Sequence, residues 1–231
     1  PGLAIDVVEL SPGVINASAY FAHANFDILN HPQVTLRADD GRNFLQRVRT
    51  GYDVITADAM IPRHAGANSL NSVEYFTLVR RALRDGGIAL QWNGGATFEE
   101  YRLILSAFAT AFPHVTLWGD GSLMVGSMSP LTVSNARIAA LLSDPRWRDV
   151  LSLINVSEPA HLERMFRAGE AEVRSLVEGV SPLSDDRPLL EYYESLPHST
   201  LDLARVPRRP ASVFKPRGPR RGPRRVDTAL A

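Results

Sequence analysis

The fold is decided by three short stretches of sequence: LAIDVVELSPG at residues 3–13, VTLRADDG at 34–41 and YDVITAD at 52–58. Each stretch is rich in apolar and β-branched residues, as buried strands of a parallel sheet are, and each runs into an acid. These acids are Glu9, Asp40 and Asp58. In an open parallel sheet, ligands bind outside the carboxyl ends of the strands. The three stretches therefore predict an α/β sheet with a carboxylate-lined cleft along one edge.

Predicted helices alternate with these strands. Ser11-Pro12 pairs a helix cap with a first-turn proline, and Thr97 with Glu100 forms a capping-box pattern. We expect helices at 11–21, 41–48, 72–83 and 97–112, and further strands at 88–92, 115–118 and 122–126. Strand–helix alternation with short connections predicts a mostly parallel, Rossmann-like sheet. The last two strands form a hairpin that adds antiparallel strands at one edge.

The pattern changes beyond Pro130, where short helices are predicted at 135–142, 146–153 and 160–177. We therefore divide the chain into a nucleoside-binding domain (1–130), a small helical extension (131–198) and a basic tail (199–231). The tail holds eight Arg and one Lys against two Asp, a balance of +7, and the neutral total leaves −7 for the rest. Its Pro/Arg/Gly mixture cannot bury a core, so we predict disorder there.

Composition excludes several kinds of site. The chain has no cysteine, so disulfides, thiolate metal sites and thiol catalysis are excluded. The six histidines form no HxH or HExxH pattern, and we predict no metal site. There is no run of about 18 apolar residues and no signal-peptide pattern at the start, which favours a cytoplasmic location. Aromatic residues do not alternate with the basic tail residues, so we expect no specific nucleic-acid binding.

Two interpretations stay open for each acid. Glu9 could hold both ribose hydroxyls of a nucleoside, or it could be a helix-start acid that favours the helix dipole. Asp40 could bind an adenine amino group, with Gly41 allowing close backbone approach, or Asp39 or Asp40 could simply cap the next helix. Asp58 could act as a general base on an incoming amine, or it could hydrogen-bond the loop that follows.

Other cleft-lining candidates come from neighbouring segments. The loop at 59–71 is long for an α/β connection, which favours an active-site loop containing Ile61, Pro62 and His64. Gln91 and Trp92 end the fourth strand, where tryptophan is more often a packing residue. The sequence SDDRP at 184–188 predicts a salt-bridged turn before a final docking strand, or an acid that projects into the cleft.

These motifs, in this order, resemble the spermidine synthase family, the polyamine aminopropyltransferases. The resemblance runs from Pro1 to about Gly126 on VVELSPGVI, ADDGRNFL, YDVITADAMIP, SLNSVEYF and GGIALQW. The segment SDDRPLLEY at 184–192 is similar to a bacterial branch whose synthase-like domain follows a membrane-spanning region. On this resemblance the chain begins inside the fold, without the first strand and the glycine-rich loop.

The resemblance implies a methyltransferase-type fold and transfer of an aminopropyl group from decarboxylated S-adenosylmethionine to an amine. Glu9 and Asp40 would bind the donor's nucleoside, and Asp58 would deprotonate the attacking amine. No prosthetic group is implied, because decarboxylated S-adenosylmethionine or S-adenosylmethionine serves as a co-substrate. A homodimer and a membrane-spanning region upstream of the chain are left open, the latter placing the domain at the cytoplasmic face of the membrane.

Two departures from the family pattern keep other functions open. Ile61 stands where family members carry a second acid that anchors a diamine, so the acceptor is uncertain. The glycine-rich loop that would support the methionine-derived part of the donor is missing. A methyltransferase that uses S-adenosylmethionine, and a non-catalytic binding or structural relative, therefore remain alternatives.

Overall fold

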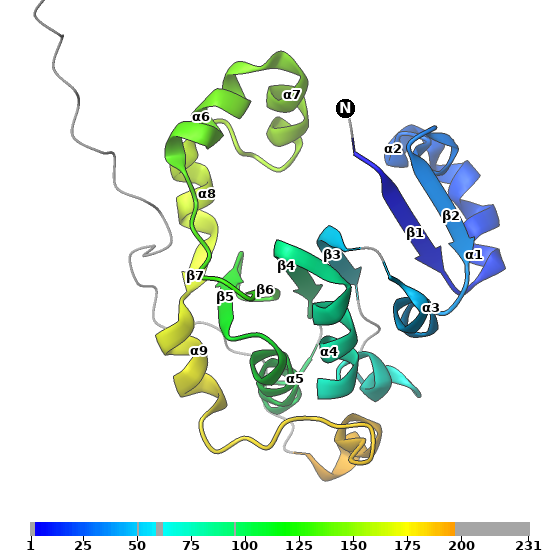
Figure 1. Cartoon of the computed structure of the whole chain (residues 1–231), viewed down its shortest axis with the longest axis vertical. Coiled ribbons are helices and arrows are strands. Elements are labelled where there is room, and N and C mark those ends of the chain that lie inside the picture. The colour runs from blue at the N-terminus through cyan, green and yellow to red at the C-terminus, as the bar shows by residue number, and fades with distance from the viewer. Residues whose placement is uncertain (1–2, 50, 59–61, 95, 197–231) are drawn as a thin grey trace, which may run out of the picture.

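The computed structural model describes residues 3–49, 51–58, 62–94 and 96–196, and its strands form two sheets covered by helices (Figure 1). The strands are β1 (Ile5–Glu9), β2 (Val34–Ala38), β3 (Tyr52–Asp58), β4 (Leu83–Trp92), β5 (His114–Trp118), β6 (Leu123–Ser127) and β7 (Phe166–Ala168). The α-helices are α1 (Pro12–Ala17), α2 (Ala22–Asn25), α3 (Gly41–Arg47), α4 (Val73–Ala82), α5 (Phe98–Ala111), α6 (Asn135–Ser143), α7 (Pro145–Leu153), α8 (Pro159–Met165) and α9 (Glu170–Val177). Short 3₁₀ helices are η1 (Ser18–Phe21), η2 (Ile28–Asn30), η3 (Ala67–Leu70) and η4 (Leu189–Ser195).

The strand pairings confirm the predicted α/β fold with a closing hairpin. β1 pairs with β2 in parallel, and β3 pairs with β4 in parallel. The hairpin strands β5 and β6 are antiparallel, and β6 lies beside β4, which gives the order β3-β4-β6-β5-β7. The division into a two-stranded and a five-stranded sheet was not predicted.

The core lies on the five-stranded sheet, in a region that we call the central layer: β4, β5 and β6 with α4 and α5. The rings of Phe76 and Phe108 meet edge to face at 5.0 Å, and Phe108 lies 4.9 Å from Phe112. Gly126 of β6 permits this packing, because a Cβ atom there would come within 2.7 Å of the Phe112 ring. The capping box of Thr97 and Glu100 starts α5 as predicted.

The amino-terminal layer, β1 and β2 with α1 to α3, is packed differently. The helices α1, α2 and α3 contain no buried residue, and neither β1 nor β3 contains one. Ile5 is 37% exposed and Val54 is 51% exposed. The prediction that the first stretch is a buried strand is therefore wrong, because among the described residues no strand pairs with the second edge of β1.

The helical extension differs from its prediction at one point. α6 and α7 lie where we expected them, but the helix predicted at 160–177 is broken into α8, β7 and α9. Phe166 is 4% exposed and Ala168 is fully buried, because β7 joins the edge of β5. The break allows Phe166 and Ala168 to be buried at the sheet edge, where a continuous helix would not have placed them.

The segment after the extension also differs from its prediction. Ser184 and Arg187 close a turn, but the 3₁₀ helix η4 follows in place of a docking strand. The predicted disordered tail lies outside the described residues, as does Ile61. Within the described ranges, every helix is too short or too polar to cross a bilayer.

Candidate active site

The predicted acids lie at the carboxyl ends of two parallel strand pairs. Glu9 is paired with Ala38 at the end of β1, and the next residue, Asp39, donates its N–H to the Glu9 carbonyl at 3.2 Å. Asp58 is paired with Trp92 at the end of β3. The ends of β1 and β2 thus bring Glu9, Asp39 and Asp40 together, and the ends of β3 and β4 place Asp58 beside Trp92.

The Glu9 carboxylate serves the start of a helix. Its Oε1 atom accepts a hydrogen bond from the backbone N–H of Ser11 at 2.7 Å, just before α1 begins. This is the structural role that the sequence left open. Among the described residues nothing donates to Oε2, so one oxygen of the half-buried carboxylate keeps its capacity to accept hydrogen bonds.

The Asp39-Asp40-Gly41 turn starts α3. Asp40 is the cap, and its Oδ1 atom accepts from the Asn43 N–H at 2.7 Å. Asp39 accepts from the Asp40 N–H at 2.9 Å and forms an ion pair with Arg47. A Cβ atom added at Gly41 would find no atom within 4 Å. The turn therefore combines a capping acid with open space beside the backbone.

Asp58 differs from the other acids. Its side chain is exposed, and no hydrogen bond or ion pair joins it to any residue that the structure describes. The loop-bonding alternative for Asp58 thus finds no support in the described part of the loop. Of the three strand-end acids, Asp58 is the one whose two oxygens are both unused by the described protein.

The end of β4 separates its two predicted residues. Gln91 is 2% exposed and faces the interior, whereas Trp92 is 46% exposed. The indole of Trp92 lies over Gly94, where an added Cβ would come within 2.2 Å of the ring. Trp92 is therefore not the packed residue that we expected, and Gly94 is the residue that lets its ring fold back.

The described part of the loop after Asp58 is held by an ion pair at Arg63. Pro62 is buried and His64 is exposed, and among the described residues no side-chain hydrogen bond of His64 occurs. Arg63 forms an ion pair of 3.0 Å with Glu100, a residue only 1% exposed. The capping-box pattern predicted the role of Glu100 at the start of α5, but nothing in the sequence indicated that Glu100 pairs with Arg63.

Sequence reasoning also missed the pairing of Arg42 with Asp185. Asp185 of the predicted salt-bridged turn pairs with Arg42 of α3, while Asp186 accepts from Ser184 Oγ at 2.6 Å. One clue was available in the sequence. The helix dipole disfavours a cation in the first turn of a helix, so an acid partner for Arg42 was to be expected as favourable.

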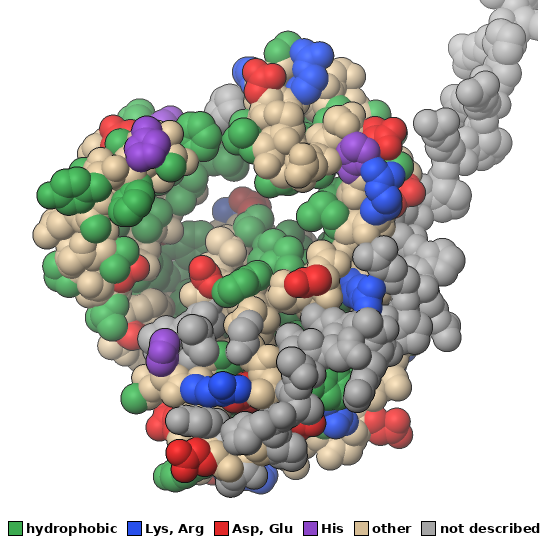
Figure 2. Space-filling model, turned by 180° about the vertical axis from the view of Figure 1, so that it is seen from behind, with side chains coloured by type: hydrophobic (Ala, Val, Ile, Leu, Met, Phe, Trp, Pro, Cys, Tyr) green, Lys and Arg blue, Asp and Glu red, His purple; other side chains and the backbone are tan. Residues whose placement is uncertain are grey.

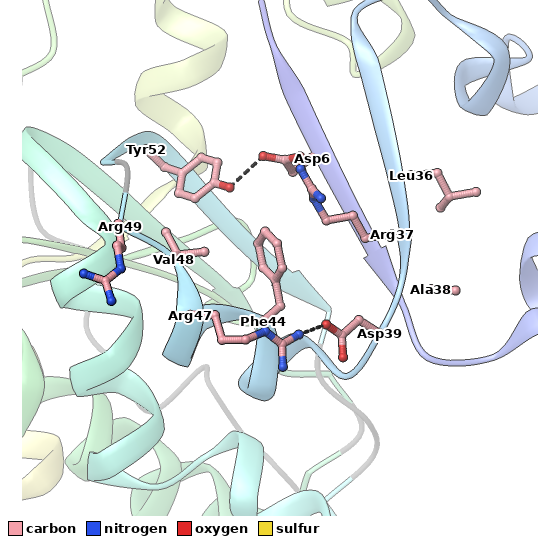
Figure 3. A pocket seen from close by; sticks show the side chains of 10 residues that line it. All are labelled: Asp6, Leu36, Arg37, Ala38, Asp39, Phe44, Arg47, Val48, Arg49 and Tyr52. Carbon is pink, nitrogen blue, oxygen red and sulfur yellow. Dashed lines mark hydrogen bonds and ion pairs between the residues drawn. The ribbon is translucent and has the colours of Figure 1, made fainter.

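A cavity of about 560 Å³ lies between the amino-terminal layer and β3 (Figure 3). Asp6 lines the cavity and accepts from Tyr52 Oη at 2.6 Å and from Arg37 Nε at 3.1 Å. Burial, helped by the bond to Asp6, raises the pKa of Tyr52 to about 12. Of the predicted site residues Asp39 alone lines this cavity, so the cavity is not the predicted cleft.

A hollow lined by hydrophobic side chains is visible in the upper half of the space-filling view (Figure 2). This accords with the exposure of apolar strand residues such as Val54. In the described residues no three His, Asp or Glu side chains gather as metal ligands.

Comparison with known proteins gives consistent matches. Residues 3–112 match the family model of the spermine/spermidine synthase domain. A polyamine aminopropyltransferase of Hamiltonella defensa is 28% identical over 111 residues, which are 48% of this chain and 38% of that protein. One from Enterobacter sp. (strain 638) is 33% identical over 91 residues, 39% of this chain and 31% of the relative. The chain thus spans about a third of the length of these curated relatives.

Solved structures show the same fold. A probable spermidine synthase from Corynebacterium glutamicum aligns with a TM-score of 0.55 at 22% identity, covering 78% of this chain and 63% of that one. A spermidine synthase in complex with the transition-state analogue AdoDATO aligns with a TM-score of 0.50 at 14% identity, covering 84% of this chain and 58% of that one.

Proposed function

We propose that this chain is the acceptor-activating part of an aminopropyltransferase, a proposal that the match of residues 3–112 to the family model of the spermine/spermidine synthase domain supports. The donor would be decarboxylated S-adenosylmethionine and the acceptor an amine. The observation that carries the proposal is the difference between the acids. Glu9, Asp39 and Asp40 each accept a backbone N–H, whereas Asp58 is exposed and has no partner in the described part of the chain.

For the donor, Glu9 would hold the ribose hydroxyls and Asp40 the adenine amino group. Each uses one oxygen in its hydrogen bond to a helix start, which orients the carboxylate and leaves the second oxygen for the ligand. The open space beside Gly41 supports close approach of the nucleoside to the backbone. Exposed Trp92, beside Asp58, could cover the reacting groups.

For the acceptor, Asp58 would first attract the ammonium form of the amine and then accept one of its protons. The neutral nitrogen then attacks the aminopropyl carbon attached to the sulfonium. A C–N bond forms, the C–S bond breaks, and both electrons of that bond go to sulfur, which leaves as neutral methylthioadenosine. A carboxylate suits this step because an amine is a nucleophile only when neutral.

Ile61 supports an acceptor other than putrescine. An apolar side chain at this position cannot pair with a second ammonium group, which the corresponding acid of family members would hold. We therefore propose an amine whose far end carries no charge at this site.

The domain division of the chain is part of the proposal. Residues 1–130 would bind the nucleoside, 131–198 would support it, and 199–231 would form a disordered tail. Among the described residues, one edge of β1 and one edge of β3 have no paired strand, and residues of both strands line the cavity, which supports a nucleoside-binding role for this part of the chain. We also propose a cytoplasmic location, while a homodimer and an upstream membrane region stay predictions.

The product of the reaction tests the proposal. The full-length protein is incubated with each donor and a panel of mono- and diamines, and the nucleoside product is identified by mass spectrometry. We expect methylthioadenosine from decarboxylated S-adenosylmethionine. S-adenosylhomocysteine formed from S-adenosylmethionine would establish the methyltransferase alternative instead. If calorimetry detects binding of neither donor nor of methylthioadenosine, both enzymatic functions fall and the non-catalytic alternative stands.

A further inference from the structure

Arg42 occupies a position that is unfavourable for a cation unless it has a partner. It lies in the first turn of α3, one residue after Gly41, where the helix dipole is positive. Its side chain is nevertheless only 17% exposed. A cation held inward at this end of a helix needs an anion to offset both the dipole and the loss of hydration.

Asp185 of the segment after α9 supplies that anion. Arg42 Nη1 donates to Asp185 Oδ1 at 2.8 Å, and Arg42 Nη2 donates to Asp185 Oδ2, so the guanidinium and the carboxylate form a two-pronged pair. Arg42 Nη1 also donates to the Ser69 carbonyl at 2.6 Å. One side chain thus joins the turn after β2, the end of the loop after β3, and the extension.

Further hydrogen bonds hold Asp185 and its neighbour Ser184 in place. Ser72 Oγ donates to Asp185 Oδ1 at 2.7 Å, and the Asp185 N–H donates to Glu74 Oε2 at 3.1 Å. Asn68 Nδ2 donates to the Ser184 carbonyl at 3.0 Å. The bonds with Arg42 hold the pKa of the Asp185 carboxyl below its usual range, and the bond from Ser72 acts in the same direction.

These contacts connect two halves of the candidate site. Asp40, the acid proposed for the adenine, lies two residues before Arg42. The loop that carries Ile61 and His64 from Asp58 ends in the 67–72 segment, which Arg42 and Asp185 hold. The Arg42–Asp185 pair is therefore placed to fix the donor side of the site relative to the acceptor side.

We propose that Arg42 and Asp185 are positioning residues: their ion pair sets the spacing between the donor-binding turn at Asp40 and the acceptor-side loop after Asp58. This inference rests on the proposed function and deepens it, because it makes the helical extension a contributor to the active site. A small misplacement of reacting groups can cost up to about 100-fold in rate. Neither residue needs to touch substrate for this effect.

The test is a double-mutant cycle on the full-length protein, comparing Asp185→Asn, Arg42→Lys and the double variant. We expect each single change to lower kcat/KM for the donor by about 10- to 100-fold. Arg42→Lys keeps the positive charge but loses the guanidinium's paired hydrogen bonds, so it should be the milder of the two changes. The double variant should be hardly worse than Asp185→Asn, because both changes break the same pair.

Asp144→Asn is the matched control. Like Asp185, Asp144 lies in the extension and pairs with an arginine, but its partner Arg146 is two residues away at the start of α7, so this pair joins no separate segments. It should leave kcat/KM unchanged. The proposal would be overturned if the fold-losses in kcat/KM of Arg42→Lys and Asp185→Asn simply multiplied in the double variant. It would also be overturned if Asp185→Asn left both the donor KM and kcat unchanged.

A second readout separates this inference from the proposed function. Hydrogen exchange of the ligand-free protein should show faster exchange in both 41–47 and 67–72 in Asp185→Asn, and in neither segment in Asp144→Asn. If the natural protein forms no product but this pattern appears, the proposed reaction fails and the coupling of the two segments stands. If exchange is unchanged in either segment, the coupling itself is refuted.

Discussion

The amino-terminal layer and the central layer are built from similarly apolar strands, yet they are packed very differently. In the central layer, β6 is paired on both edges and α5 buries Tyr101, Ile104 and Phe108. In the amino-terminal layer, β1 is paired on one edge, and Tyr20 and Phe26 are 83% and 75% exposed. The difference shows that an apolar strand sequence specifies burial only when neighbours cover both its edges and its faces.

This contrast has a functional side. The candidate donor acids lie on the loosely packed layer, and Asp58 lies on the edge of the five-stranded sheet that faces it. The Tyr52–Asp6 hydrogen bond across the cavity joins the amino-terminal layer to β3, at the edge of the five-stranded sheet (Figure 3), and the Arg42–Asp185 pair joins the same layer to the extension. If the two layers differ in stability as they differ in packing, matched substitutions in them should have unequal effects.

The largest expected effect is on the central layer. Phe108→Ala removes a ring that is 1% exposed and packed between Phe76 and Phe112, so we expect a loss of about 3–5 kcal/mol in the free energy of unfolding. Urea denaturation measures it. Phe26→Ala makes the same change in the amino-terminal layer and should stay within about 0.5 kcal/mol of the unmodified protein. Equal losses would show that the two layers are packed alike.

A smaller effect is expected where the loop after β3 is fastened to the central layer. Glu100→Ala removes the acceptor of the Thr97 N–H at 2.6 Å and the partner of Arg63, so we expect a loss of about 1.5–3 kcal/mol. Thermal unfolding measures it. The control is Arg47→Gln, which breaks the exposed pair with Asp39 and should cost less than about 1 kcal/mol. A control that cost as much as Glu100→Ala would refute this ranking.

The smallest effect concerns the link between the layers. Tyr52→Phe removes the bond to Asp6, and we expect a loss of about 0.5–1.5 kcal/mol at neutral pH. Because the pKa of Tyr52 is about 12 in the fold and about 10 when unfolded, the unfolded chain releases its proton first. The contribution is therefore full below about pH 10 and declines as pH rises towards 12. Denaturation curves at pH 8 and pH 11 check this, and a difference between variant and parent that grew with pH would contradict it.

Much of the fold could be predicted because its determinants are local. The capping box at Thr97, the proline at the start of α1 and the β5–β6 hairpin follow from residues close together in sequence. The short strand β7 could not, because Phe166 becomes a strand residue only when the edge of β5 is available. Burial of β1 was mispredicted for the same reason, since it depends on neighbours that the strand sequence does not specify.

The site was predictable to the same extent. The positions of Glu9, Asp40 and Asp58 at strand ends follow from the alternating pattern, and the structure confirms them there. Which acid remains unpaired could not be predicted, because it depends on capping bonds made after each strand. The Arg42–Asp185 contact joins residues 143 positions apart, and only the folded chain brings them together.

The measurement that tests the central claim most directly is a comparison of Asp58→Asn with Asp53→Asn in single-turnover assays of methylthioadenosine formation. Both acids lie on β3, and Asp53 pairs with Arg84 at the far end of the strand. We predict that Asp58→Asn loses about 100-fold or more in rate while binding the donor normally, and that Asp53→Asn keeps the parent rate. Unchanged turnover in Asp58→Asn would contradict the account.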